Sequence, residues 1–136
     1  MKPLLVGEAN PYSRDPSHAL YPLPRQASGN RLRTILGMSD ELYLETFDRC
    51  NLCVGHKWSL KLARIVATKH LAEREVLILL GAKVCSAFDL AFTPFEVVRV
   101  AKTTCAILPH PSGLSRAWNN PTAIKRARAA VREVLK

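Results

Sequence analysis

Residues 76–81, Val-Leu-Ile-Leu-Leu-Gly, restrict the fold of this chain more than any other segment. The apolar side chains do not alternate with polar ones, which predicts a strand covered on both faces rather than one with a solvated face. Such strands occur mainly in α/β proteins, where helices pack on both sides of a parallel sheet. The run therefore predicts a sheet between two layers of helices.

The rest of the chain alternates between strand-like and helix-like segments. Strands are expected at residues 4–7, 97–100 and 104–108, with a weaker candidate at 46–50 that ends at Asn51. Helices are expected from Ser28 to Gly37, after Asp40, from Ser59, over 82–88, and from Pro121 (capped by Asn120) to about Leu135. This alternation predicts a three-layer α/β/α sandwich with a central, mostly parallel four-stranded sheet. The length of 136 residues fits a single domain spanning residues 1–136.

Basic residues outnumber acidic ones by 20 to 11, a formal net charge of +9. From Ala101 onward there is one acid, Glu133, and the basic residues are Lys102, Arg116, Lys125, Arg126, Arg128, Arg132 and Lys136. A one-sided basic field favours a polyanion such as nucleic acid, although a basic protein without such a partner is the simpler alternative. The basic residues of the last helix either contact phosphates or form an ordinary solvated face. No apolar run approaches the ~18 residues of a membrane span, so no membrane partner is expected.

The cysteines are Cys50, Cys53, Cys85 and Cys105. The apolar stretch near Met1 is too short for a signal peptide, so we expect a cytoplasmic or nucleoid-associated protein that is not secreted and whose thiols are reduced. Cys50, Cys53 and His56 have a spacing that can hold a metal, but no second pair follows at finger spacing. We therefore expect structural cysteines and no metal.

Three polar clusters follow expected strands, at residues 7–12, 48–52 and 108–116. In a parallel sheet, ligands bind at the carboxyl ends of the strands. Each cluster alone has an ordinary use as a turn or a strand end. Together, at one edge of the sheet, they predict a binding site.

Two of these clusters resemble motifs of the uracil-DNA glycosylase superfamily. Residues 7–12, Gly-Glu-Ala-Asn-Pro-Tyr, are similar to its first motif, and residues 110–114, His-Pro-Ser-Gly-Leu, to its more specific His-Pro-Ser loop. The resemblance runs from Leu4 to the final helix. It implies a uracil-DNA glycosylase-like fold and a monofunctional hydrolase that flips uracil or a modified pyrimidine out of DNA and cleaves its N-glycosidic bond. Some branches hold an iron–sulfur cluster with two cysteines ahead of the first motif; none stands there in this chain, so no cofactor is expected.

The resemblance assigns catalytic roles to His110, Asn10 and Glu8. Cleavage leaves an anionic base and an oxocarbenium-like sugar, so a catalyst must stabilise the anion and position water. His110 would donate a hydrogen bond to the departing base oxygen, and a neutral ring is enough for that. Asn10 would hold the water through its carbonyl oxygen, with the Glu8 carboxylate beside it as a stronger base. The structural alternative for His110 is a loop histidine bonded to backbone.

Base recognition would fall to Asn51, Tyr12 and Tyr21. The Asn51 amide offers a donor and an acceptor that match one edge of a pyrimidine, although a strand-end cap is its ordinary role. Tyr12 would exclude thymine at the 5-position, or is simply a packed loop aromatic. Tyr21, in the segment 19–23, lies where the family carries the aromatic platform for the base.

DNA contacts would come from the loop after His110. Ser112 and Gly113 would let the backbone approach phosphates, Leu114 would fill the vacated stack, and Ser115 and Arg116 would add phosphate contacts. Trp118 is expected to fix this loop to the core. The expected partner is single- or double-stranded DNA, bound through its backbone without sequence specificity by a monomer.

Two other functions fit the same residues. In one, the pocket binds a nucleobase or a DNA end without cleaving it, since Asn10 stands where some family members have a carboxylate. In the other, the chain is an enzyme that acts on an unusual phage or cellular base.

Overall fold

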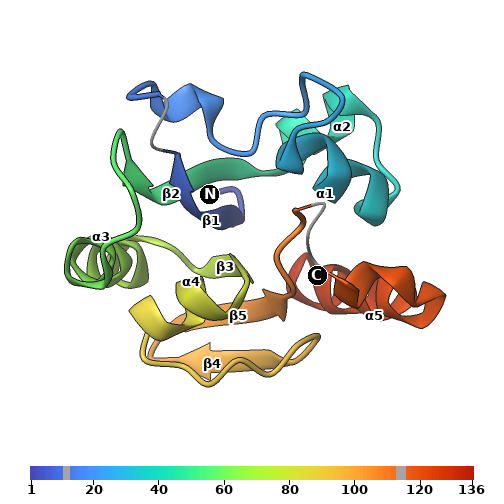
Figure 1. Cartoon of the computed structure of the whole chain (residues 1–136). Coiled ribbons are helices and arrows are strands. Elements are labelled where there is room, and N and C mark those ends of the chain that lie inside the picture. The colour runs from blue at the N-terminus through green and yellow to red at the C-terminus, as the bar shows by residue number, and fades with distance from the viewer. Residues whose placement is uncertain (11–12, 113–115) are drawn as a thin grey trace.

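The structure, a computed structural model, describes residues 1–10, 13–112 and 116–136 (Figure 1). Its centre is a five-stranded sheet in the order β2-β1-β3-β5-β4. The strands are β1 (Leu4–Asn10), β2 (Asp48–Val54), β3 (Val76–Leu80), β4 (Val97–Val100) and β5 (Thr103–Leu108). The first four strands in that spatial order are mutually parallel, and β4 pairs antiparallel with β5 at one edge. The α/β class and the mostly parallel sheet are confirmed, whereas the expected number of four strands is wrong.

The fifth strand comes from the segment that the sequence marked as weakest. Residues 48–54 form a full edge strand along β1, with Gly7 opposite Asn51 and Asn10 opposite Val54. An edge strand has only one neighbour and one covered side, so its mixed sequence carries no continuous apolar run. The same pairing continues β1 to Asn10. Glu8 and Asn10 therefore lie in a strand, not in the loop after it, and Asn51 lies within β2 rather than at its end.

Helices cover both faces of the sheet. They are α1 (Ser28–Leu36), α2 (Asp40–Thr46), α3 (Leu60–Glu73), α4 (Ala82–Ala87) and α5 (Pro121–Val134), with short 3-10 helices η1 (Pro16–His18) and η2 (Arg116–Asn119). Leu5, Ile78 and Leu108 pack with side chains of α1 and α5, whereas Leu4, Leu79 and Ile107 pack with side chains of α3 and α4. Figure 1 shows these two helical layers on opposite sides of the strands. Neighbouring strand residues thus alternate between two cores, and both are apolar, which explains the uninterrupted run in β3.

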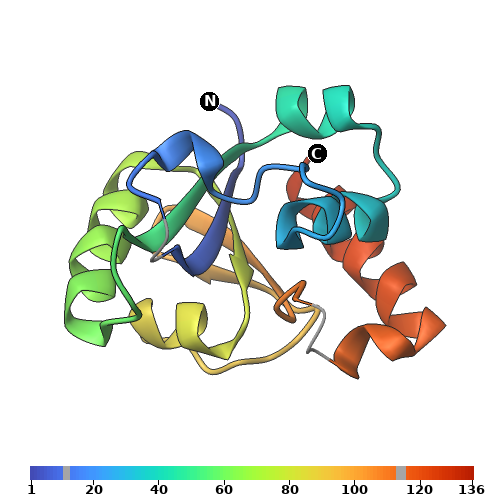
Figure 2. The same cartoon turned by 45° about the horizontal axis from the view of Figure 1, so that its top comes forward.

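The helix caps explain where the helices begin. Ser59 and Asn120 cap α3 and α5 with their side chains, as expected, and Pro121 occupies the first turn of α5. Ser39, not Asp40, caps α2 by accepting a hydrogen bond from the Leu42 N–H. The helix α1 begins at Ser28 itself, after Ala27. Figure 2 shows α1 lying alongside α5.

No helix in the described part of the chain is long and apolar enough to cross a membrane.

Candidate functional site

A cavity of about 560 Å³ opens where β1 ends beside β2. Its other walls are the chain around residues 18–24, the start of α1 and the end of the loop that follows β5. The predicted site residues that line it are Glu8, Asn10, Tyr21, Asn51 and His110. The structure therefore brings together, from two strands and two loops, most of the side chains to which the resemblance assigns catalytic and base-reading roles.

Asn51 reaches this cavity because its partner on β1 is a glycine. Gly7 lies opposite Asn51 in the parallel register, and a Cβ added to Gly7 would collide with the Asn51 amide oxygen. The amide thus lies over the Gly7 backbone, with the side chain of Leu20 also close to that position. A side chain at position 7 would displace the amide from the cavity.

His110 is held by two hydrogen bonds, one to its ring and one to its backbone carbonyl. The Ser112 N–H donates a hydrogen bond to His110 Nδ1 at 3.1 Å, and the buried Trp118 donates its indole N–H to the His110 carbonyl at 3.0 Å. A backbone N–H can only donate, so Nδ1 must be the unprotonated nitrogen of a neutral ring, and the ring proton is on Nε2. The expectation that Trp118 fixes this loop agrees with that contact.

Burial, more than the neighbouring charges, also favours the neutral ring of His110. Burial lowers the pKa of His110 below its ordinary value of 6.5, the Glu8 carboxylate opposes this shift, and Lys83 adds to it. Glu8 and His110 meet at Gly81, because a Cβ there would lie 3.2 Å from His110 Cβ and 3.5 Å from Glu8 Oε1. Gly81 has φ +97°, a conformation that favours glycine, so the residue after β3 leaves room for both side chains.

Tyr21 lies at the rim of the cavity, 38% exposed, on a segment that several contacts hold in place. The Arg49 guanidinium lies 5.1 Å from the centre of the Tyr21 ring and donates hydrogen bonds to the carbonyls of Ser17 and Ala19. In addition, the hydroxyl of the buried Tyr43, on α2, donates a hydrogen bond to the Leu20 carbonyl at 2.8 Å. A Cβ on Gly29 would collide with the carbonyls of Leu20 and Tyr21, so α1 packs directly against this segment.

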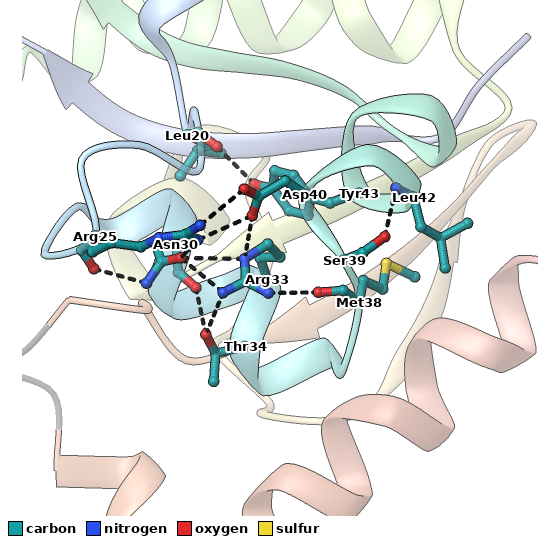
Figure 3. Close-up of polar contacts among 10 residues, drawn as sticks. All are labelled: Leu20, Arg25, Asn30, Arg33, Thr34, Met38, Ser39, Asp40, Leu42 and Tyr43. Carbon is teal, nitrogen blue, oxygen red and sulfur yellow. Dashed lines mark hydrogen bonds and ion pairs between the residues drawn. The ribbon is translucent and has the colours of Figure 1, made fainter.

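A polar cluster ties the next part of the same segment to α1 and α2 (Figure 3). Both carboxylate oxygens of Asp40 accept hydrogen bonds from the Arg25 guanidinium, and one of them also pairs with Arg33 Nε, with N···O distances of 2.9–3.2 Å. Asn30 accepts hydrogen bonds from Arg25 and Arg33, and its amide nitrogen donates to the Arg25 carbonyl. The loop between η1 and α1 is therefore anchored at both ends of the cavity wall that it forms.

Several predicted residues lie elsewhere or outside the described residues. Tyr12, Gly113, Leu114 and Ser115 fall outside the described ranges. Arg116 is exposed at the start of η2, and Ser112 is half-buried, with its N–H used by His110. On α5, Arg126 packs over the Phe95 ring and Arg128 donates to the Ile35 carbonyl at the end of α1. None of the described residues that line the cavity comes from α5.

Sequence reasoning missed the residues that position the site. Gly7, Gly81 and Arg49 contact the predicted side chains or hold the loop that carries them. A glycine at the end of each of two apolar strand segments was the available signal, but it only has meaning once the register between β1 and β2 is known.

The cysteines do not form a cluster with His56. Cys53 lies 3.5–3.6 Å from the backbone of Ser59, and Cys50 lies 3.5 Å from His70 Nε2. The His56 ring contacts the Lys57 carbonyl instead. Within the described ranges, no group of three or more His, Cys, Asp or Glu side chains is arranged to hold a metal ion.

Neither the protein-family models nor the curated proteins contain a match to this chain. The case for a function therefore depends on the residues around the cavity and on their chemistry.

Proposed function

We propose that this protein is a DNA glycosylase of the uracil-DNA glycosylase type, which removes uracil or a modified pyrimidine by hydrolysis. One observation carries the proposal: Asn51 and His110, far apart in the sequence, line the same cavity together with Glu8, Asn10 and Tyr21. A cavity of about 560 Å³ is large enough for a base and its sugar, within the usual range of small-molecule sites.

The base would enter between the Tyr21 ring and the strand ends. The Asn51 amide, held over Gly7, presents a donor and an acceptor to the edge of a pyrimidine. Tyr21 offers a ring face for stacking, and the guanidinium of Arg49 already restricts its position. Because a base in a duplex is inaccessible, the target nucleotide must be extruded or lie in a single strand.

His110 would stabilise the leaving group. As the bond between the sugar C1′ and the base nitrogen breaks, its electron pair moves to the base, and negative charge develops on the base oxygens. His110 Nε2–H donates a hydrogen bond to one of these oxygens, since Nδ1 is occupied by the Ser112 N–H. A fixed donor of this kind contributes roughly 3 kcal/mol to lowering the barrier.

A water molecule completes the reaction by attacking C1′. Its oxygen forms the new bond to the sugar, and its proton passes to a base. Asn10 and Glu8 both line the cavity, and Glu8 is the carboxylate of the pair. We assign Glu8 as the proton acceptor and Asn10 as the residue that orients the water. Glu8 thus provides the carboxylate that the uncharged Asn10 lacks.

Uracil release from DNA tests the proposal. The protein is incubated with uracil-containing single- and double-stranded oligonucleotides, and abasic sites are then cut by heating in alkali. We expect strand scission that His110→Ala, Asn51→Asp and Glu8→Gln each reduce strongly. Arg99→Gln, at the exposed residue of the edge strand β4, is the matched control and should cleave as the unaltered protein does.

Binding without scission in the unaltered protein would overturn the proposal and favour a module that recognises a base without cleaving it. Full activity in His110→Ala would remove the assigned role of that residue, even if the class of enzyme were correct.

A further inference from the structure

A second cavity of about 550 Å³ lies next to the first, on the other side of the start of α1. The two cavities share Ala27 and Ser28 as lining residues, and the consecutive residues His110 and Pro111 line one cavity each. A chain-like ligand that passes over Ala27 and Ser28 would thus enter both. Two adjoining cavities are suited to two successive units of a polymer.

The lining of this second cavity is apolar on one side and basic on the other. Pro111, Trp118 and Ile124 come from the loop after β5, from η2 and from α5, and their side chains are buried or half-buried. Arg25 and Arg31 come from the loop before α1 and from α1 itself, together with the polar side chains of Gln26 and Ser28. No Asp or Glu is among the described residues that line it.

The two arginines differ in whether they already form an ion pair. Arg25 is bound to Asp40 at 3.2 Å, whereas Arg31 has no ion-pair partner among the described residues. A half-buried arginine without an ion-pair partner, in a cavity that apolar side chains also line, matches a phosphate joined to a flat ring. A nucleotide has both parts, and the adjoining cavity already requires one.

We propose that the second cavity binds the nucleotide next to the excised one on the same strand, with Arg31 on its phosphate and its base against Pro111, Trp118 and Ile124. This inference rests on the proposed function, since the first cavity must hold a nucleotide of that strand. A base stacked inside a duplex cannot enter a cavity, so the protein should prefer single-stranded DNA. Cleavage should also depend on the presence of one neighbouring base.

The experiment uses single-stranded oligonucleotides with one central uracil, in which a tetrahydrofuran abasic spacer replaces the 5′ or the 3′ neighbour. Uracil release is measured with the unaltered protein, Arg31→Gln, Ile124→Ala and the control Arg99→Gln. Binding of the same oligonucleotides is measured by fluorescence anisotropy with His110→Ala protein, alone and combined with each of these three substitutions. Thermal unfolding checks that each variant is folded.

We expect the spacer on one side to raise the KM and the dissociation constant about tenfold, and the spacer on the other side to have little effect. Arg31→Gln should weaken binding of the intact oligonucleotide by roughly tenfold, and Ile124→Ala should weaken it less. On the oligonucleotide that lacks the sensitive neighbour, Ile124→Ala should bind as Arg99→Gln does.

The two proposals fail in different ways. Release of uracil that is insensitive to both spacers and to both cavity variants would overturn the proposal for the second cavity and leave the proposed glycosylase activity standing. The opposite result is a protein that never releases uracil but loses binding in Arg31→Gln and with one spacer. It would overturn the proposed glycosylase activity and leave the second cavity as a nucleotide site.

Discussion

Two partly buried histidines differ in what holds them: His110 lies in the loop after β5, and His70 lies in α3. His110 accepts the Ser112 N–H on Nδ1 and lines the cavity. His70, near the end of α3, has Nε2 3.5 Å from the Cys50 thiol, and its buried Nδ1 meets no hydrogen-bond partner within the described residues. One ring is fixed by a strong donor and faces open space, and the other is packed against a thiol.

Titration does not distinguish these two histidines. Burial is the largest cause that lowers the pKa of each, with smaller effects from Lys83 and Glu8 on His110, and from Arg74, Glu73 and Lys69 on His70. Burial also raises the pKa of Cys50 to about 12, so the group beside His70 is a neutral thiol at physiological pH. The hydrogen-bond partner and the adjoining cavity, rather than the direction of a pKa shift, therefore mark a histidine as a candidate for chemistry.

The largest expected difference between them is in catalysis. His110→Ala should lower kcat for uracil release by about 100- to 1,000-fold, because a donor to the developing anion is lost. His70→Ala should leave kcat unchanged. Single-turnover kinetics on a uracil-containing single strand measures both. Equal losses in the two variants would show that the comparison has no functional meaning.

A smaller loss should follow from releasing His110 without removing it. Ser112→Pro removes the N–H that holds Nδ1, so the ring can adopt the wrong tautomer or turn, and kcat should fall about tenfold. Ser112→Ala keeps that N–H and is the control, with kcat preserved. If Ser112→Ala lowers kcat as much as Ser112→Pro, the hydroxyl and not the backbone holds the site.

The pH dependence sharpens the same comparison. Because the pKa of His110 is lowered, kcat should stay constant as the pH falls through 6.5 and decline only below it, when protonation places a second donor against the Ser112 N–H.

The stability of the protein should depend on pH differently from kcat. In the unfolded chain both histidines bind protons near pH 6.5, whereas the folded state resists this, so the free energy of unfolding should decrease from about pH 6.5 downward. Urea titrations at several pH values measure that slope.

The smallest effect is expected at His70. His70→Leu replaces a ring with an unpaired buried nitrogen by an apolar side chain, and should raise the free energy of unfolding by on the order of 1 kcal/mol. It should also make the acid-induced loss of stability shallower. Uracil release should not change. A destabilised His70→Leu protein would indicate that the contact with Cys50 outweighs the unpaired nitrogen.

The inner strands of the sheet followed from the sequence because they have apolar runs, and the short edge strand β4 was also found at the expected residues. The strands β3 and β5 lie inside the sheet and are covered on both faces, so hydrophobicity alone locates them. The strand β2, Asp-Arg-Cys-Asn-Leu-Cys-Val, is at the edge and only Leu52 and Cys53 in it are buried. Its length, and with it the fifth strand, depends on pairing with β1, which a local pattern does not contain.

The site was predictable as a set of residue types and not as an arrangement. Motif resemblance indicated His110, Asn51 and Glu8, whereas their geometry depends on register and on two glycines. Gly7 matters only because it lies opposite Asn51, and Gly81 only because β3 ends between Glu8 and His110. Contacts between distant segments of this kind have no signature in a single sequence.

The ion pairs of Asp40 have an effect on ligands that never touch it. The loop that carries Tyr21 is held to α2 by the contacts of Arg25 with Asp40 and of Tyr43 with the Leu20 carbonyl, so its shape does not depend on a ligand. Binding then has little conformational entropy to remove from this loop, which favours a stable complex from few contacts. A substitution at Asp40 should thus weaken ligand binding from a distance. The cavity would keep every lining side chain, but the loop that forms its wall would adopt several conformations.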